Sequence, residues 1–341
     1  MIEIDGSFGE GGGQVLRTAL GLSLATGQPF RIANIRAGRS KPGLRRQHLT
    51  AVRAAADVGD AETAGARMGS GELTFAPTDV RPGRHRFSVG TAGSATLVLQ
   101  TVLPALLTAA GPSSLTLEGG THNPFAPPFD FIARTFLPVV NRMGPQVTVE
   151  LQRAGFYPAG GGRFTAEIEP TGRLEPIELV ERGRERGRAA RAMLSSLPLH
   201  VAERELEVVA REPGWADAER TLDIVDDPAG PGNALLLEMA FDNIVEVVTG
   251  FGRKGLRAEA VARAALKEAG EYLESEAPVG LHLADQLLVP LALAGGGRYR
   301  AAALTEHART NIEVVRAFLP VGIAVAEPAA GCVEVAIGAD V

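Results

Sequence analysis

Residues 5–17 read Asp5-Gly-Ser-Phe-Gly-Glu10-Gly-Gly-Gly-Gln14-Val-Leu-Arg17, a glycine-rich loop between a short extended segment and a helix expected over about residues 14–25. Glycine lets a backbone approach a ligand closely, and the N–H groups that open a helix favour an anion. The spacing matches neither common nucleotide-binding fingerprint. Glu10, Gln14 and Arg17 nevertheless offer a carboxylate, an amide and a guanidinium within two helical turns. Taken alone, such a loop is more often a tight strand-to-helix turn than a binding site.

One order of elements recurs along the chain: strand, glycine-rich loop, helix, strand, loop, helix and two strands. The first copy is expected over about residues 1–78 and the second over about 79–170. A third starts in 171–181 and, after an interruption, continues over 277–341. Around a pseudo-threefold axis the loops of all three copies would converge on one cleft, whereas a solenoid would keep them in a row.

The interruption, residues 182–276, carries a pattern of its own, with two helices and three strands near 199–211, 258–272, 221–225, 235–240 and 244–249. The predicted fold class is therefore α/β (α+β). Residues 1–181 and 277–341 are expected to form a larger domain of three repeated β-α-β-α-β-β units, and residues 182–276 a smaller inserted α/β domain. Within the repeats, periodicity predicts a strand over 30–36 and helices over about 129–143, 282–294 and 311–318.

The composition is that of an ordinary globular protein, with 45% hydrophobic and 22% charged residues among 341. The sequence has no apolar run long enough to span a membrane and no signal-peptide pattern, so a cytoplasmic enzyme is expected. Cys332 is the single cysteine, which excludes an intramolecular disulfide and a cysteine-rich zinc site.

The formal net charge of −6 argues against non-specific coating of duplex nucleic acid but leaves room for a local basic cleft. Clusters of basic residues are mostly solvated faces, so their position in the fold decides whether they bind a ligand. Two basic clusters stand out: Arg36, Arg39, Lys41, Arg45 and Arg46, and Arg182, Arg184, Arg186, Arg188 and Arg191.

His307 is the best candidate nucleophile or general base among six histidines. It is expected in a short loop between an apolar strand and an amphipathic helix, which Thr310 or Asn311 could cap. A neutral imidazole nitrogen can attack phosphorus, and the phosphoramidate formed is reactive enough to pass its group on. From position alone, a loop histidine bonded to a backbone carbonyl is the more common case.

Other polar positions have both a functional and a structural interpretation. His282 and Asp285 share one helix face, and Asp285 either binds a partner or complements the helix dipole. Gln100 interrupts an apolar helix and needs hydrogen-bond partners, which a nucleotide or the backbone could supply. Arg39 and Lys41, before a helix start, form either a phosphate clamp or a solubilising surface.

Taken together, these segments strongly resemble the RNA 3′-terminal phosphate cyclase family over essentially the whole chain. No one of the motifs is specific, but the set is. Its anchors are residues 5–17, Arg36-Ala-Gly-Arg-Ser-Lys-Pro-Gly43, Gly155-Phe-Tyr-Pro-Ala-Gly-Gly-Gly162, Leu283-Ala-Asp-Gln-Leu287 and Thr305-Glu-His-Ala-Arg-Thr-Asn311.

The resemblance implies three repeated α/β units with an inserted domain and ATP-dependent conversion of an RNA 3′-phosphate into a 2′,3′-cyclic phosphodiester. His307 would attack the α-phosphate of ATP to form a covalent histidine–AMP. AMP would then pass to the RNA 3′-phosphate, and the 2′-hydroxyl would displace it. The partners implied are ATP, a divalent metal (Mg or Mn) and RNA with a 3′-phosphate, without a membrane. The oligomeric state stays open, a homodimer being one option.

Carried over position by position, the resemblance makes Glu10 a ligand of the metal that bridges the ATP phosphates. His282 departs from a tyrosine found in some relatives, which alters the stacking contact with the base, although histidine can still stack. The remaining implied positions are phosphate contacts at Arg17, Arg39 and Arg36, polar support at Gln14 and Gln47, nucleotide contacts at Gln100, His282, Leu283, Ala284, Asp285 and Gln286, and an adenine contact at Pro127.

Three rival functions remain at this stage. A noncatalytic family member that acts as a scaffold in ribosome assembly would be expected to lack the nucleophile, whereas His307 is present. An enolpyruvyl transferase is built from similar repeated units but needs no covalent histidine. A pure RNA-binding module is disfavoured by the acidic balance and by the single tryptophan and three tyrosines.

Overall fold

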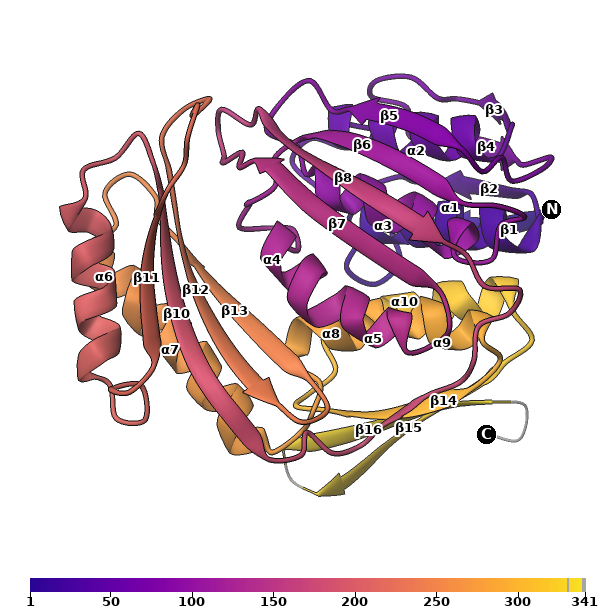
Figure 1. Ribbon diagram of the computed structural model, residues 1–341. Coiled ribbons are helices and arrows are strands. Elements are labelled where there is room, and N and C mark those ends of the chain that lie inside the picture. The colour runs from indigo at the N-terminus through magenta and orange to yellow at the C-terminus, as the bar shows by residue number, and fades with distance from the viewer. Residues whose placement is uncertain (330, 339–341) are drawn as a thin grey trace.

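The computed structural model describes residues 1–329 and 331–338, which form helices packed among four mixed four-stranded sheets (Figure 1). Three of the sheets share one strand order, in which the first two strands run parallel and the last two pair antiparallel. The first sheet is β1 (Ile2–Asp5), β2 (Phe30–Ala33), β4 (Leu73–Ala76) and β3 (Glu62–Ala64).

The second and third sheets repeat this order with their own strands. The second contains β5 (Arg84–Ser88), β6 (Ser113–Gly119), β8 (Gly162–Glu169) and β7 (Gln146–Arg153). The third contains β9 (Glu178–Leu179), β14 (Gly297–Ala301), β16 (Cys332–Gly338) and β15 (Gly322–Ala329). A mixed α/β fold is therefore present, as the sequence predicts.

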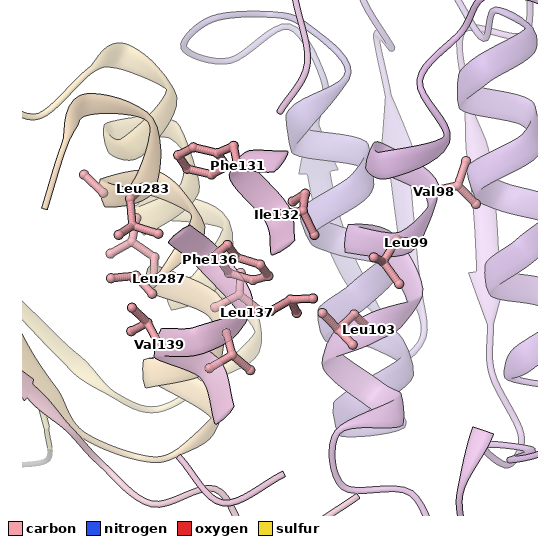
Figure 2. Close-up of a cluster of buried hydrophobic side chains, with 14 of the residues drawn as sticks. Val98, Leu99, Leu103, Phe131, Ile132, Phe136, Leu137, Val139, Leu283 and Leu287 are labelled. Atoms are coloured by element: carbon pink, nitrogen blue, oxygen red, sulfur yellow. The ribbon is translucent and has the colours of Figure 1, made fainter. Parts of the chain in front are cut away.

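The helices of these three parts pack together and carry most of the apolar core. Helix α1 (Gln14–Thr26) contacts α2 (Arg46–Val58), α3 (Ala95–Leu106), α9 (Leu288–Leu293) and α10 (Glu306–Phe318). Figure 2 shows Leu99 and Leu103 of α3 facing Ile132 and Leu137, with Leu283 and Leu287 on the far side of that segment. The packing brings residues hundreds of positions apart to one centre.

Two predicted helices are broken, each a few residues from a proline. The segment expected over 129–143 divides into α4 (Phe129–Phe131), the π-helix η1 (Ile132–Phe136) and α5 (Leu137–Asn141). The segment expected over 282–294 divides into α8 (Leu281–Gln286) and α9. Pro138 and Pro290 lack an N–H group and crowd the carbonyl four residues earlier, which interrupts the regular ladder.

Residues 185–275 form a separate layer with the different strand order β11-β10-β12-β13. The strands are β10 (Glu185–Ser195), β11 (Glu219–Ile224), β12 (Gly232–Phe241) and β13 (Val245–Phe251). Helices α6 (His200–Arg211) and α7 (Ala258–Ser275) cover one face, and β13 lies beside α4 and η1 (Figure 1). The arginine-rich stretch that the sequence presents as a basic cluster is largely strand β10, an element the sequence analysis missed.

The chain leaves and rejoins the third sheet at one edge. Leu179 of β9 pairs in parallel with Tyr299, and Val279 pairs in parallel with Ala301, two positions further along β14. Val279 thus takes the place along this edge that an uninterrupted β9 would reach two residues later.

Smaller differences have local causes. Strand β2 ends at Ala33, before the predicted residue 36, because Asn34 and Arg36 both adopt a positive φ of 54°. Helix α10 begins at Glu306, five residues before the predicted start at 311. Within the described residues, no helix combines the length and apolar character needed to cross a membrane.

Candidate active site

A cavity of about 750 Å³ lies where α1, α3, α8 and the start of α10 meet, and β13 contributes to its wall. Segments from residue 10 to residue 311 therefore share one space. The cavity is lined by twelve of the fourteen positions that the sequence nominates: Glu10, Gln14, Arg17, Arg36, Arg39, Gln47, Gln100, Pro127, His282, Asp285, Gln286 and His307.

Leu283 and Ala284 are the exceptions. Both are fully buried and do not line the cavity. On a helix, residues three and four apart share a face, so His282, Asp285 and Gln286 face the cavity while the two apolar residues face the core. The side chains of Leu283 and Ala284 therefore lie outside the cavity lining, and the nucleotide-binding role that the resemblance implies for these two positions stays a prediction.

His307 lies in the first turn of α10 and not in a loop. The helix is capped by Thr305, whose hydroxyl accepts a hydrogen bond from the Ala308 amide at 3.2 Å. The two residues expected as caps form other hydrogen bonds. Thr310 donates to the Glu306 carbonyl at 2.7 Å, and Asn311 accepts from the Thr18 hydroxyl at 2.6 Å.

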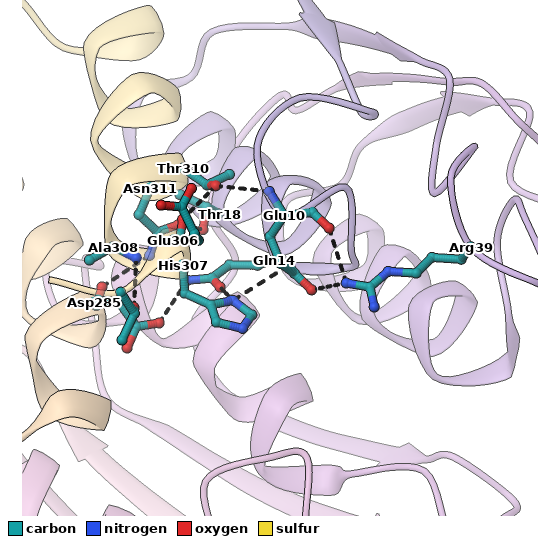
Figure 3. A network of polar contacts seen from close by, with 11 residues as sticks. Glu10, Gln14, Thr18, Arg39, Asp285, Glu306, His307, Ala308, Thr310 and Asn311 are labelled. Atoms are coloured by element: carbon teal, nitrogen blue, oxygen red, sulfur yellow. Dashed lines mark hydrogen bonds and ion pairs between the residues drawn. The ribbon is translucent and has the colours of Figure 1, made fainter.

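A series of hydrogen-bonded side chains holds the His307 imidazole in place (Figure 3). The Gln14 amide donates from Nε2 to Asp285 Oδ2 at 2.7 Å, which turns Gln14 Oε1 toward His307 Nδ1. Because an amide oxygen can only accept, Nδ1 must donate its proton to it. The neutral ring then keeps its lone pair on Nε2, which forms no hydrogen bond among the described residues and belongs to a side chain that is 50% exposed.

Two carboxylates stand near this imidazole. Glu10 Oε2 lies 3.5 Å from His307 Nδ1, and Asp285 acts at one remove through Gln14. Burial raises the pKa of Asp285, and the hydrogen bond from Gln14 opposes that rise. Positive charge that develops on the ring would face the Glu10 carboxyl group directly and the Asp285 carboxyl group through Gln14.

The glycine-rich opening loop is docked on α10. The Glu10 amide donates to the Thr310 hydroxyl at 3.2 Å, and Gly9 has a positive φ of 58° at a point where a side chain would collide with Thr310. Arg39 donates to the Glu10 carbonyl at 3.0 Å and pairs with Glu10 Oε1. The glycines thus serve close packing between distant segments, which fixes the Glu10 carboxylate.

Arg17 presents a half-buried positive charge to the cavity. Burial lowers its pKa to about 10, against the raising effects of Glu10 and Asp285, so it stays charged near neutrality. It has no ion pair within 4.0 Å among the described residues, whereas buried charges are ordinarily paired. An anionic ligand in the cavity would supply the missing partner.

Arg36 and His48 complete this wall. Arg36 is tied to its own loop, donating to the Lys41 and Gly43 carbonyls at 2.7 and 3.1 Å. His48 lines the cavity too, a residue that the sequence analysis passed over because it stands alone. Burial and then the neighbouring arginines lower its pKa to about 3, so its Nδ1 accepts from the Arg45 amide at 3.2 Å as a neutral ring.

A further part of the cavity lining comes from α3, α7 and α8. Gln100, which is half-buried, donates to Gln286 Oε1, and Gln286 donates to the His282 carbonyl at 2.8 Å. His282 pairs with Glu268 at 3.2 Å, and that contact raises the pKa of the imidazole. Pro127, on the loop that precedes α4, also lines the cavity.

Sequence reasoning also missed part of the lining that comes from residues 182–276. Val247, Thr249 and Phe251 of β13 reach the cavity, and Phe125 stands beside Pro127 at 96% exposure. Alternation along β13 predicts which of its residues share a face but not that this face covers a distant loop.

The residues present fit a divalent cation held mainly by substrate oxygens. Glu10 Oε2 is buried and has no hydrogen-bond partner in the part of the chain described. No group of three or more histidine, cysteine, aspartate or glutamate side chains within residues 1–329 and 331–338 could hold a metal alone. Magnesium is commonly bound by one or two carboxylates together with phosphates, and Glu10 offers a carboxylate oxygen for such a site.

Comparison with known proteins agrees with these features. The model of the family described as RNA 3′-terminal phosphate cyclase matches residues 8–325. A relative with that name from Koribacter versatilis is 54% identical over 337 residues, covering 99% of this chain and 95% of its own, and one from Pseudomonas fluorescens is 53% identical over 323 residues, covering 95% and 94%.

One solved structure is also similar, the enolpyruvyl transferase NikO from Streptomyces tendae, with 11% identity and a TM-score of 0.37. The match covers 98% of this chain but 47% of that one, and a similarity this low bears on neither fold nor function. The family match and the two relatives, by contrast, extend over nearly the whole sequence. The chain belongs to the RNA 3′-terminal phosphate cyclase family.

Proposed function

We propose that the protein converts an RNA 3′-phosphate end into a 2′,3′-cyclic phosphodiester at the expense of ATP, as a ligase-type nucleotidyl transfer. The family and the names of its relatives support the substrate and the reaction. The observation that carries the mechanism is the His307 imidazole, whose Nδ1 is held by Gln14 while Nε2 faces the cavity.

In the first step, the Nε2 lone pair of His307 attacks the α-phosphorus of ATP. The P–N bond forms, the bond to the bridging oxygen breaks, and pyrophosphate leaves. The ring becomes a cation that keeps its Nδ1 proton, so the Gln14 oxygen and the Glu10 carboxylate at 3.5 Å stabilise it. Arg17 and Arg39 supply positive charge for the phosphates.

In the second step, an oxygen of the RNA 3′-phosphate attacks the phosphorus of histidine–AMP. The P–N bond breaks and its electron pair returns to Nε2. The adjacent 2′-hydroxyl then attacks the RNA phosphorus, losing its proton to solvent, and AMP leaves as the ring closes. Activation is needed because a phosphate monoester has a poor leaving group, whereas its adenylate releases AMP.

A divalent metal, Mg or Mn, would be held by Glu10 and would neutralise charge on the ATP phosphates. Glu10 offers Oε2 for it, since Oε1 pairs with Arg39. Pro127, Gln100, His282 and Gln286 would hold the adenine, with histidine taking the stacking place of an aromatic residue.

We further propose that the three sheets of equal strand order are repeats around a pseudo-threefold axis, about 1–78, 79–170 and 171–181 with 277–341. Residues 182–276 would then be a domain inserted into the third. The register of Leu179 and Val279 along β14 supports this, because the chain resumes where it left.

The test incubates the protein with a 3′-phosphorylated RNA oligonucleotide, ATP and magnesium. We expect the RNA end to become resistant to phosphatase and the reaction to release AMP and pyrophosphate in equal amounts. A scaffold protein would bind RNA and leave the end phosphatase-sensitive, and an enolpyruvyl transferase would leave both the RNA end and ATP unchanged. Either result would remove the proposed function.

A further inference from the structure

We propose that Phe125 and the basic loop of residues 252–257 together bind the last nucleotides of the RNA substrate. A base stacks on Phe125, and Arg253, Lys254 and Arg257 contact backbone phosphates inboard of the reacting end. The inference rests on the proposed function and names the surface that selects single-stranded RNA for it.

Phe125 is placed as a stacking platform. Its side chain is 96% exposed although it lines the cavity, an unusual cost for a phenyl ring in a folded protein. The loop that carries it is fixed at both ends, by Asn123 donating to the Ala92 carbonyl at 2.7 Å and by the Thr96 hydroxyl donating to the Pro127 carbonyl at 2.7 Å. An exposed aromatic ring on a loop anchored at both ends suits unpaired bases, which offer a flat face whatever their sequence.

The basic loop begins where β13 ends. Phe251, the last residue of β13, lines the same cavity as Phe125, and Lys254 follows it within about 11 Å of extended chain. The Leu256 amide donates to the Arg253 carbonyl at 3.0 Å, which folds the loop back on itself. Arg253, Lys254 and Arg257 are all exposed, and within the described residues their side chains form no ion pair or hydrogen bond.

The more conspicuous arginines of residues 182–191, in and just before β10, are in contrast already engaged within the protein. Arg184 and Arg186 pair with Asp242, Arg188 with Glu185, and Arg191 with Asp130 and Asp223. Arg182 lies over the Phe241 and Tyr272 rings, 5.1 and 4.6 Å from their centroids. Cations already paired with carboxylates gain less from a phosphate, so the basic cluster that the sequence emphasises is the weaker RNA contact.

Acidic residues at the same end of this sheet do not cancel the positive charge of the basic loop. Strand β12 begins at Gly232 and pairs Ala234 with Phe251, so the segment before β12 lies at the end where β13 finishes. Of its two aspartates, Asp227 is paired with Arg153 at 3.0 Å. This leaves one acidic side chain, Asp226, to offset the three cations of the basic loop.

The pairing of an aromatic surface with free cations beside a cavity that holds a catalytic histidine favours a nucleic-acid end over a protein partner. The test measures binding of a 3′-phosphorylated RNA hexamer to the intact protein by fluorescence anisotropy at several salt concentrations. Lys254→Ser/Arg257→Ser should lower the salt slope by about 1.4 and weaken binding about 25-fold at 0.1 M salt, since each single-strand phosphate contact contributes about 0.7.

Arg184→Ser/Arg186→Ser is the matched control, because it removes the same charge from paired residues at the other end of the sheet. We expect its slope and affinity to stay near wild type. An unchanged Lys254/Arg257 variant, or an equal loss in the control, would overturn the inference. If the wild-type protein itself fails to bind or cyclise the hexamer, the proposed function is what fails.

Phe125→Ala should raise the KM for the RNA hexamer about tenfold, the size expected for one stacked base, with Phe125→Trp restoring it. Self-labelling with α-labelled ATP in the absence of RNA should keep its wild-type KM for ATP. The reverse pattern, a higher KM for ATP with RNA unaffected, would assign Phe125 to the adenine and contradict the inference.

Discussion

Two histidines in this molecule are held by similar partners and yet face opposite surroundings. His307 is 50% exposed in the cavity, with Nδ1 bound to Gln14 and Nε2 unengaged by the described residues. His122 is completely buried, with Nδ1 2.8 Å from the Thr121 hydroxyl and Nε2 2.8 Å from Asp130. His307 joins segments that are distant in sequence, whereas His122 joins residues of one local segment, and His307 alone of the two keeps a lone pair for chemistry.

The difference shows what converts a structural histidine into a nucleophile. Burial, reinforced by Arg191, lowers the pKa of His122 to about 3, so the ring is neutral and both nitrogens are occupied. Through Asp130 and Arg191 it ties the loop before α4 to strand β10. His307 has the same kind of support at one nitrogen only, which leaves the other free to attack.

The strongest way to separate the two regions is to remove each ring. His307→Ala should lower RNA cyclisation by at least about 10⁴-fold, because no other side chain can form the covalent intermediate. Its melting temperature should stay near wild type, since the ring is half exposed. His200→Ala, at an exposed histidine that begins α6, is the matched control and should retain full activity.

Gln14→Ala breaks the support of His307 without removing the nucleophile. Losing the acceptor for Nδ1–H lets the other tautomer and other ring orientations compete, so the rate of self-adenylylation should fall about 10²-fold. The KM for ATP should change less than the rate, as measured by single-turnover labelling. A loss confined to the KM for ATP would make Gln14 a nucleotide ligand and not a positioning residue.

His122→Ala acts on the sealed network and should affect stability instead of chemistry. It leaves a cavity and deprives Asp130 and Thr121 of a buried partner, at a cost of about 3 kcal/mol in unfolding free energy. Urea unfolding measures the loss, and self-adenylylation per folded molecule should stay unchanged. Equal losses of activity and stability would place His122 in the active site.

The buried rings also predict a steep pH dependence of stability on the acid side. His48 and His122 have folded pKa values of about 3, below the ordinary value of 6.5. The unfolded chain therefore takes up protons first, and stability is lost as pH falls from 6.5 toward 3, with each ring adding up to about 1.4 kcal/mol per pH unit. His122→Gln should make the unfolding free energy less steep in this range, and an unaltered slope would contradict a neutral buried ring.

Much of the fold was accessible from sequence because apolar periodicity is strong in the repeated segments. The exceptions have definite causes. Pro138 and Pro290 interrupt helices that periodicity alone extends, and β10 alternates arginine with small and acidic residues in a way that reads as a charged cluster. Alternation of apolar and polar residues predicts a strand, whereas alternation among charged and small residues does not.

The candidate site likewise contains residues that the sequence could nominate and residues that it could not. Glu10, Arg17 and His307 lie in motifs whose residue types already suggest phosphate chemistry, so the sequence could nominate them. His48 and Phe251 carry no local signal, because their place in the cavity depends on packing between distant segments. The free charge of residues 253–257 could be recognised only after the ion pairs of β10 were seen.

The most direct test of the central claim is covalent labelling. The protein is incubated with magnesium and α-labelled ATP, without RNA, and the labelled peptide is mapped. The account predicts one acid-labile, base-stable label on His307, lost in His307→Ala and retained by His122→Ala in its folded fraction. A label that persists in His307→Ala, or that never forms in the wild-type protein, would contradict it.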